Sequence, residues 1–312
     1  MKVMQNDIDI SDYVTSVTWA GSSSQVSRTL SYSVANNPLD SELPSPTAAL
    51  GDIVKFFDDE NKRRFIGIVT GREKKSELGD ITVECKDFLH YLIRDKYSGT
   101  FKNTTAESIT RKVCSAVGIG TKDLIKTKIH IKKLLAEGES AYSVIVKAYN
   151  KASVKQKKYY MPYMKGTKLS VKQKWKSSGV ELCMDIESAS YSENSDSMVN
   201  QVAIYNDKGK KIGVVRDNES IRRYGRYQEV YTKEKGVNSK TAATKLFHGI
   251  TKEASVRAIG YVAAISGNSI KITEKSTGLS GTYYITSDSH TWENGIHMMD
   301  LTIRWKRSRE AV

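Results

Sequence analysis

The hydrophobic period of the chain changes twice, and this change constrains the fold more than any other feature of the sequence. Residues 1–95 alternate short stretches rich in Val, Ile, Thr and aromatic residues with turn residues, which indicates the strands of a small barrel. Residues 96–185 have the longer period of amphipathic helices. The β pattern returns over residues 186–312, with an inserted helix expected at residues 238–255. We therefore predict an α+β, mainly β fold, with two similar small β-barrel domains and a helix-containing α+β insert between them.

Local signals place the expected helices and loops. Thr104 and Glu107 have capping-box spacing and Gly118 supplies a stop, so they bound a short helix. Ser140 is the candidate N-cap of a second helix. The segment after this helix has the pattern of a β-hairpin that packs on both helices. Three prolines within residues 36–46 predict a long loop in the first barrel.

Two segments far apart in the chain have nearly the same sequence. Residues 54–69 and residues 202–215 each contain two apolar stretches around a polar turn. When they are aligned with a two-residue gap, most of their apolar and charged positions match, and Ile66 falls opposite Ile212. The repeat predicts the same β-hairpin twice, once in each barrel, as expected after an internal duplication.

The formal net charge of +14 bears on the partners of the chain. Between Lys122 and Lys176 there are fifteen lysines, no arginine and only three acidic residues. Such a field attracts polyanions, which include nucleic acid, acidic surfaces and acidic proteins. The alternative is a solvated, self-repelling face, which the absence of arginine favours because arginine is preferred for bidentate phosphate recognition.

The start of the chain has no continuous apolar stretch of the kind that a secretory signal contains. No apolar run approaches the roughly 18 to 20 residues that cross a bilayer. We therefore expect a protein that is made in the cytoplasm, stays soluble and has no membrane partner. Cys85, Cys114 and Cys183 lack CxxC spacing, which is typical of reduced, mostly buried thiols rather than of a disulfide frame or a zinc site.

No group of residues has the spacing of a catalytic motif. His290 and His297 flank an expected hairpin turn, and we interpret them as polar residues at the turn rather than as metal ligands. Glu193 and Asp196 have the minimum composition of a glycosidase pair, but such pairs occur in nearly every protein. The sequence therefore predicts no catalytic residue, no metal site and no cofactor.

Three blocks of the sequence resemble one known family. Residues 80–119 are similar to the end of the first barrel and the first helix in hub proteins of contractile phage tails. The similarity is to the branch found in defective prophages and phage-tail-like bacteriocins of Gram-positive bacteria. Residues 190–234 resemble the start of the second barrel in the same proteins, and residues 277–305 resemble their closing hairpin. Residues 257–276 depart from the family because they lack the proline of its usual loop, which leaves the geometry of this loop open.

The resemblance implies a structural, non-enzymatic baseplate hub of a contractile phage tail or tail-like bacteriocin. In such hubs three subunits form a homotrimeric ring, and their paired barrels present six similar domains. The ring adapts the sixfold tail tube to the threefold central spike, with residues 1–95 facing the tube. The implied partners are two further copies of the chain, the tail tube or tube-initiator protein, the central spike protein and other baseplate proteins. The expected location is the tail baseplate of the particle, after synthesis in the host bacterial cytoplasm.

Turn positions of the two repeated hairpins are the candidate interface residues, expected to be exposed near a subunit or tube contact. These residues are Asp58, Asp59, Lys62, Arg63, Asn206, Asp207, Lys210 and Lys211. The basic insert is expected to face an acidic baseplate neighbour or the lumen. Two alternatives stay open: a nucleic-acid-binding protein that uses the lysine-rich insert, and a cell-wall hydrolase that acts through Glu193 or another carboxylate. The hub hypothesis itself implies no binding of a specific nucleic-acid sequence.

Overall fold

The structure is a computed structural model of the chain, and it describes residues 1–23, 27–35, 48–74 and 81–307. The loop predicted at residues 36–46 lies outside this part of the chain. Within the described residues, no helix is both long and apolar enough to cross a membrane.

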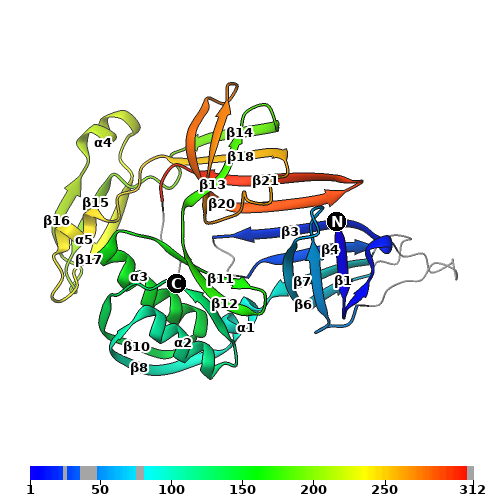
Figure 1. The fold of residues 1–312 in the computed structure, drawn as a ribbon. Coiled ribbons are helices and arrows are strands. Elements are labelled where there is room, and N and C mark those ends of the chain that lie inside the picture. Colours follow the sequence, from blue (N-terminus) through cyan, green and yellow to red (C-terminus); the bar gives the residue numbers. More distant parts are fainter. Residues whose placement is uncertain (24–26, 36–47, 75–80, 308–312) are drawn as a thin grey trace. The chain divides into compact units, whose positions relative to one another are not determined.

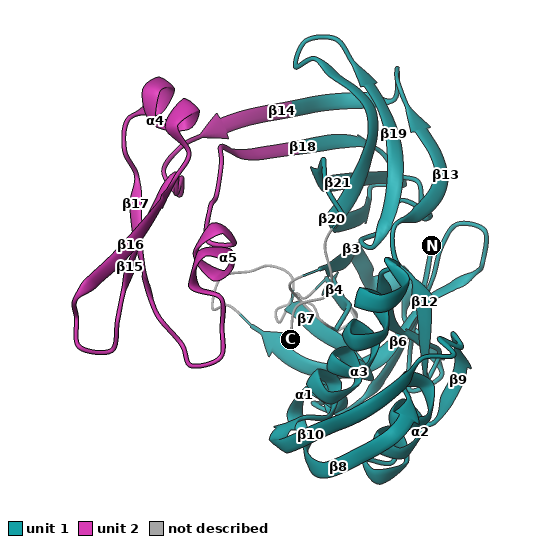
Figure 2. Ribbon diagram, turned by 90° about the vertical axis from the view of Figure 1, so that its left-hand side faces the viewer, with its two compact units in different colours: residues 1–189, 255–312 teal, residues 190–254 magenta. Residues whose placement is uncertain are grey.

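The chain forms two compact units, which are coloured separately in Figure 2. Unit 1 consists of residues 1–189 and 255–312, and unit 2 consists of residues 190–254. The division into two barrels and an insert, with the boundaries that the sequence suggests, stays a prediction.

The main sheet has thirteen strands and is curled into a half-barrel (Figure 1). Eleven strands follow one another in the order β14 (Ile186–Asn194), β18 (Thr251–Ile259), β21 (Ile296–Arg304), β20 (Leu279–Glu293), β3 (Val14–Ser22), β4 (Thr29–Val34), β7 (Ile81–Asp87), β6 (Arg63–Glu73), β5 (Ile53–Phe57), β1 (Lys2–Gln5) and β2 (Ile8–Asp9). A short 3-10 helix, η1 (Ser11–Tyr13), precedes β3. In addition, β19 (Asn268–Glu274) pairs with β20 and, in parallel, with β13 (Lys176–Leu182). Because β20 pairs with β3, strands from both ends of the chain share one sheet.

Alternation of buried and less buried residues explains why segments such as β4 and β7 are strands. In β4 and β7 every second residue is buried, and the register places Leu30 opposite Cys85 and Tyr32 opposite Val83. Side chains on one face of an antiparallel pair pack directly across the ladder. These pairs therefore form part of one apolar core that also contains Trp292 of β20.

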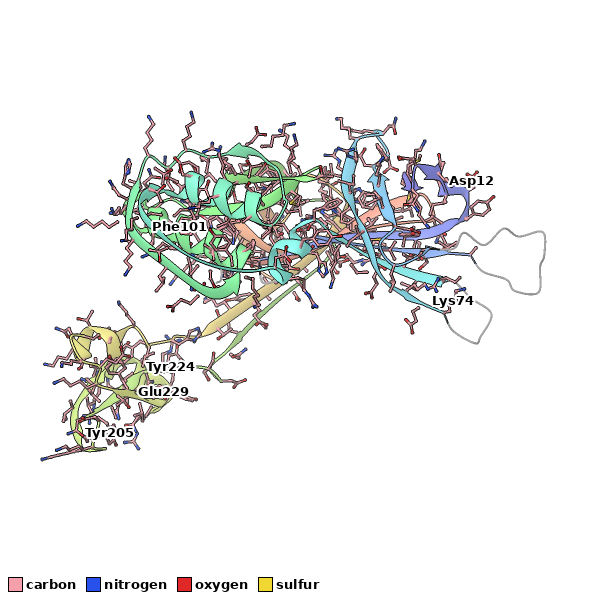
Figure 3. All side chains as sticks on the ribbon, turned by 90° about the horizontal axis from the view of Figure 1, so that it is seen from below. Asp12, Lys74, Phe101, Tyr205, Tyr224 and Glu229 are labelled. Carbon is pink, nitrogen blue, oxygen red and sulfur yellow. The ribbon has the colours of Figure 1, made fainter. Side chains whose placement is uncertain are left out.

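The insert follows β7. Its elements are α1 (Leu89–Arg94), β8 (Lys96–Thr105), α2 (Ala106–Ala116), β9 (Thr121–Leu124), β10 (His130–Ser140), α3 (Ala141–Gln156), β11 (Tyr160–Lys165) and β12 (Lys168–Gln173). The antiparallel pair β8–β10 and the helices enclose a second apolar core, to which Phe101 belongs (Figure 3). The predicted hairpin is β11–β12, and its Tyr160 packs against Tyr149 of α3 with ring centroids 5.4 Å apart.

The helix ends differ in one respect from the sequence signals. Ser140 caps α3 as predicted, and Gly118 ends the α2 segment with a φ of +72°. The capping box at Thr104 is wrong, because Thr104 pairs within the β8–β10 ladder and Thr105 caps α2 instead. The Glu107 carboxylate accepts a hydrogen bond from the hydroxyl of Thr127.

Unit 2 is built around a separate three-stranded sheet with the order β16-β15-β17. Its elements are β15 (Gln201–Tyr205), β16 (Lys211–Arg216), α4 (Asn218–Tyr224), β17 (Gln228–Thr232) and α5 (Ser239–Thr244). Tyr205, Tyr224 and Glu229 of this unit are labelled in Figure 3. A small core of Val202, Ile204 and Ala243 joins the sheet to α5.

The helix expected at residues 238–255 is much shorter in the structure. Asn238 caps α5, but the helix ends at Thr244, and the backbone of His248 pairs with that of Val199. Strand β18 then begins at Thr251. Gly249 and the β-branched residues after it favour this change to an extended backbone. The predicted fold class, α+β and mainly β with a helix-containing insert, is confirmed.

Candidate functional site

The turn between β5 and β6 is held by the carboxylate of Asp58. Its Oδ1 accepts hydrogen bonds from the backbone N–H groups of Glu60 at 3.1 Å and Lys62 at 2.8 Å. Its Oδ2 accepts a hydrogen bond from Nε of Arg64 at 2.5 Å. Asn61 adopts the left-handed conformation that the turn requires, with a φ of +57°.

The charge of Asp58 is part of this turn. Burial opposes ionisation of the carboxyl group, which belongs to a residue only 5% exposed. The backbone N–H of Lys62 and the guanidinium of Arg64 outweigh burial, so the pKa of Asp58 lies below its ordinary value. Asp58 is therefore ionised near neutral pH, and its buried carboxylate stabilises the turn.

The turn between β15 and β16 repeats the same hydrogen bonds. Oδ1 of Asn206 accepts from the backbone N–H groups of Lys208 at 3.0 Å and Lys210 at 2.8 Å. The N–H of Asn206 donates to the carbonyl of Lys210 at 2.9 Å, as the N–H of Asp58 donates to that of Lys62 at 3.0 Å. Gly209 takes the left-handed position, with a φ of +72°.

The ladders on either side of the turns also match. Val54 pairs with Gly67 in the first hairpin, and Val202 pairs with Val215 in the second. Each residue of the second hairpin therefore corresponds to the residue 148 positions earlier, the difference between 202 and 54, along its whole length. The two hairpins align without a gap.

This result corrects the sequence alignment of the repeat. Both ladders contain a bulge at the same place, and the extra residue is Arg64 in the first hairpin and Ile212 in the second. Ile212 thus corresponds to Arg64 and not to Ile66. The alignment with a two-residue gap matched similar side chains, whereas the backbone hydrogen bonds show which positions are equivalent.

The candidate interface residues differ in exposure. The exposed ones are Asp59, Lys62, Arg63, Asp207, Lys210 and Lys211. Asp58 is buried and Asn206 is half-buried, so the expectation of exposed turn positions is wrong for these two. The side chains of both residues accept hydrogen bonds from the turn backbone. Whether the exposed six lie at a subunit or tube contact stays a prediction.

Asp59 connects the first turn to the C-terminal strands. Its Oδ1 lies 2.9 Å from the amino group of Met1, and its Oδ2 accepts a hydrogen bond from Nε1 of Trp292 at 2.9 Å. Burial opposes ionisation of Asp59, but these two donors outweigh it and lower its pKa. The Trp292 ring stacks on His297, with centroids 3.9 Å apart and planes within 12°.

The two histidines are not simple turn residues. His290 is fully buried, its Nδ1 lies 3.1 Å from Nε2 of His297, and its Nε2 lies 3.2 Å from the carbonyl oxygen of Ala264. Burial lowers the pKa of each histidine to about 4, so both rings are neutral near pH 7. The interpretation of His290 as a polar residue at the surface of a turn is wrong, since β20 carries its side chain into the core. Among the described residues, no group of three or more His, Cys, Asp and Glu side chains is placed to hold a metal ion.

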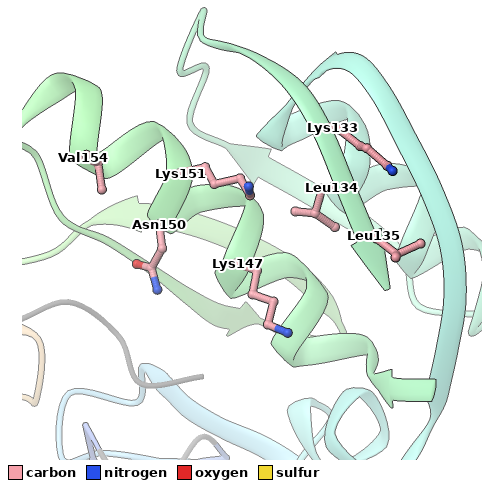
Figure 4. Close-up of a pocket in the computed structure, with 7 residues that line it drawn as sticks. All are labelled: Lys133, Leu134, Leu135, Lys147, Asn150, Lys151 and Val154. Carbon is pink, nitrogen blue, oxygen red and sulfur yellow. The ribbon is translucent and has the colours of Figure 1, made fainter. Parts of the chain in front are cut away.

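The lysine-rich insert carries an open groove between α3 and β10 (Figure 4). Lys133, Lys147 and Lys151 lie around it, and exposed Leu135 and Val154 line it as well. The groove has a volume of about 610 Å³, and an adjoining groove of about 530 Å³ extends it along the same helix. It combines lysine charges with apolar side chains, which suits an acidic amphipathic segment better than a bare phosphate chain.

Glu193, the residue named for the hydrolase alternative, lies on exposed β14. Its Oε1 pairs with Nζ of Lys252 at 2.6 Å. This bond and that from the hydroxyl of Tyr191 lower the pKa of Glu193. A general acid of a glycosidase needs a raised pKa, so the surroundings of Glu193 oppose that role.

The arrangement of strands and insert is the fold of a known phage tail protein. The chain is similar to the 43 kDa tail protein of prophage MuSo2 from Shewanella oneidensis, with a TM-score of 0.72, 14% identity and 97% of each chain covered. A family model described as YQBQ-like matches residues 17–304, and the chain belongs to this family.

Two relatives from Bacillus subtilis strain 168 agree with this assignment. The chain is 28% identical over 275 residues to the protein YqbQ, with 83% of this chain and 82% of YqbQ covered. It is 24% identical over 267 residues to the phage-like element PBSX protein XkdQ, with 81% of each covered. The family resemblance drawn from the three sequence blocks is therefore confirmed.

Proposed function

We propose that this chain is a structural baseplate hub of a contractile phage tail or tail-like bacteriocin. Three copies form a ring that joins the sixfold tail tube to the threefold central spike. The general part of this proposal, a tail or baseplate component, is supported by the relatives, one of which is named for a phage-like element and another as a prophage tail protein. The particle baseplate is then the place where the protein resides.

The observation that carries the hub role is the gapless equivalence of the two hairpins. A chain that meets a sixfold tube with three copies needs two similar contact elements per copy. Asp58 and Asn206 organise turns with the same hydrogen bonds and the same left-handed position. The exposed lysines that follow, Lys62 and Lys210, hold matching positions in these turns.

The groove of the insert supports an acidic protein as a further partner. Lys133 and Lys151 face it and have no carboxylate partner among the described residues, while Lys147 pairs with Glu139 at 2.5 Å. Exposed Val154 adds apolar surface that a neighbouring protein would cover. A structural role rather than catalysis also agrees with the lowered pKa of Glu193.

Electron microscopy of particles from the producing cell tests the hub role. For this experiment a hexahistidine tag is added to the chain and located with nickel–gold, and we expect the label as a threefold ring at the junction of tube and spike. Label elsewhere on the particle, or none on it, contradicts the proposal.

Charge reversal in the turns tests the equivalence of the hairpins. We expect Lys62→Glu and Lys210→Glu to reduce incorporation of the chain into particles to a similar extent, because both turns would meet the tube in the same way. Lys240→Glu, an exposed reversal on α5, is the matched control and leaves incorporation unchanged. A defect in only one of the two turn variants would contradict the proposal that both hairpins contact the sixfold tube in the same way.

The nucleic-acid alternative has a simple separate test. It requires binding of DNA that weakens steeply with salt, since lysine contacts to phosphates release counterions. We expect no such binding by the folded chain at low salt, and salt-sensitive binding that Lys133→Glu and Lys151→Glu abolish would favour this alternative.

A further inference from the structure

A second concave site lies in unit 1, and Arg63 at the start of β6 belongs to its lining. It has a volume of about 350 Å³ and lies among β3, β6, the β11–β12 hairpin and the segment that precedes β19. Among the described residues, five cationic side chains line it, together with a single carboxylate, that of Asp87. The cations are Arg28, Arg63, Arg64, Lys165 and Lys172.

Three of these cations are paired with carboxylates. Arg28 makes a two-pronged ion pair with buried Asp288, Arg64 pairs with Asp58, and Lys165 pairs with Asp123. Arg63 and Lys172 have no carboxylate partner among the described residues, and Nζ of Lys172 donates a hydrogen bond to Oδ1 of Asn268 at 3.3 Å. The site therefore holds cationic groups beyond those that its own carboxylates engage.

Unpartnered hydrogen-bonding atoms gather at the same place. Among the described residues, the buried polar side-chain atoms without a partner are Nε1 of Trp19, Nε of Arg28, Oγ of Ser266 and the hydroxyl of Tyr231. The first three belong to residues that line this site. Each of the three carries a hydrogen that it can donate, and leaving a buried donor unpaired is unfavourable.

The side chains of Arg28 and Ser266 approach the same point of the backbone, at Gly21. Ser266 is 1% exposed, and a Cβ on Gly21 would lie 3.2 Å from its Oγ and 2.4 Å from Nη1 of Arg28. The Arg28 guanidinium lies over the Trp19 ring, 3.9 Å from its centroid. The ion pair with Asp288 and the ring fix the guanidinium in place, and Nε is left available. Donors held in advance by their surroundings bind an anion with little further ordering.

We propose that this pocket is an oxyanion-binding site, in which Lys172 and the donors of Arg28 and Ser266 hold a carboxylate or phosphate group. Charged oxygens accept several hydrogen bonds at once and are the natural complement to grouped N–H and O–H donors beside unpaired cations. Burial and nearby Arg28 lower the pKa of Lys172 to about 8, which leaves it mainly charged at pH 7. The inference does not depend on the hub role.

Titration calorimetry on the full chain tests this site with two probes, inorganic phosphate and glutarate, at constant ionic strength set by chloride. We expect saturable binding of at least one probe. Lys172→Met and Ser266→Ala remove proposed ligand contacts, and the loss of the charged contact weakens binding at least about tenfold. Arg63→Gln, at the exposed rim, weakens it less.

Lys168→Met is the matched control, because Lys168 lies on the same strand as Lys172 but its stem lies over Gly120. It leaves binding unchanged. Binding of phosphate alone identifies a free ion or phosphorylated group as the ligand, and binding of glutarate alone identifies a carboxylate such as that of a neighbouring acidic side chain. No saturable binding of either probe overturns the proposal, as does equal binding by the wild type and Ser266→Ala. If Lys172→Met does not fold, Arg63→Gln and Ser266→Ala decide the question.

Discussion

Asp58 shows how one buried carboxylate organises a surface turn. Two backbone N–H groups and the Arg64 guanidinium converge on its oxygens. In the second hairpin the uncharged amide of Asn206 serves the same backbone donors without an arginine. The shared function of the two residues is therefore to accept backbone hydrogen bonds, and the ion pair is an addition in the first turn only.

Substitution of Asp58 separates these two contributions. We expect Asp58→Ala to lower the free energy of unfolding by about 2–3 kcal/mol, because buried donors lose their acceptor. Asp58→Asn retains the acceptor oxygen and loses only the partly exposed ion pair, so its effect is about 1 kcal/mol or less. The measurement is urea unfolding followed by tryptophan fluorescence, which reports on unit 1 alone because all four tryptophans lie there. Equal losses in the two variants would show that the charge, and not the acceptor, holds the turn.

The buried histidines make stability depend on pH. The pKa of His290 and of His297 is about 4 in the folded chain, below the ordinary value of 6.5, so the unfolded chain binds more protons between these values. The contribution of the two neutral histidines to the free energy of unfolding is complete above about pH 6.5, and it is lost as the pH falls toward 4. Asp87 changes stability with pH in the opposite sense. Burial raises its pKa to about 6, so its contribution to stability is lost as the pH rises.

The variant His297→Phe isolates this effect. The phenyl ring retains the stacking on Trp292 and does not titrate, whereas Asp87 is the same in both proteins. We expect the variant to be less stable than the wild type at pH 7.5 and the difference to shrink at pH 4.5. Thermal unfolding monitored by tryptophan fluorescence at both pH values measures this change, and a constant difference would contradict it.

At the scale of elements, the two hairpins have the same local structure in different sheets. Strand β5 pairs antiparallel with β1 on its other side, whereas β15 pairs in parallel with β17. The turn conformation therefore follows from local sequence and does not require the same neighbours. Its left-handed position is occupied by Asn61 in one hairpin and Gly209 in the other, the two residue types that tolerate this conformation best.

This equivalence makes a prediction about Gly209. We expect Gly209→Asn to keep the β15–β16 hairpin intact at a cost of a few tenths of a kcal/mol, because Asn61 shows that asparagine fits the turn. Gly209→Val places a β-branched residue at positive φ and costs about 1–2 kcal/mol. Hydrogen exchange of the amides in residues 201–216 measures local opening. Similar exchange in both variants would mean that the turn does not depend on the left-handed position.

Much of this could be predicted from the sequence, and the exceptions have physical causes. The alternation in β4 and β7, the cap at Ser140 and the hairpin β11–β12 rest on local signals, which the structure follows. The end of α5 depends on pairing of His248 with Val199, a contact 49 residues apart that no local pattern encodes.

The contacts of the proposed pocket join residues that are even more distant in sequence, so local patterns cannot predict them. Arg28 and Asp288 are separated by 260 residues and meet only because β20 pairs with β3. His290 looked like a turn residue because it lies near the end of β20, yet the alternation of that strand directs its side chain inward. Sequence spacing could not have joined any of these residues into one site.

At the scale of the whole molecule, each unit has its own core. Unit 2 has the small cluster around Val202, Ile204 and Ala243, and the described residues of unit 1 contain two larger clusters. The chain enters and leaves unit 2 through β14 and β18, which are neighbours in the main sheet. A segment with adjacent ends and a separate core can be removed without loss of the remaining core.

We therefore expect unit 1 to fold without most of unit 2. Residues 195–250 are replaced by a short Asn-Gly turn that joins β14 to β18. We expect the thermal unfolding midpoint of the shortened chain, measured by tryptophan fluorescence, to lie within about 4 °C of that of the full chain. This shift corresponds to a change of ~1 kcal/mol or less in the free energy of unfolding for a protein of this size. Loss of the cooperative transition would show that unit 1 needs unit 2 to fold.

The pairing of β3 with β20 also has a consequence for synthesis of the protein. Thr18 lies beside Thr291, 273 residues later in the chain. While the ribosome makes the intervening residues, one edge of β3 therefore lacks its partner, and an unpaired strand edge is a template for wrong pairing. Growth of the polypeptide is far slower than local folding, so early strands wait for seconds in this state. If translation slows near the end of the message, β3 waits longer for β20, and we expect more aggregation of nascent chains. Strands β15 and β16 of unit 2 are close in sequence, so we expect a delay within their codons to affect that hairpin little.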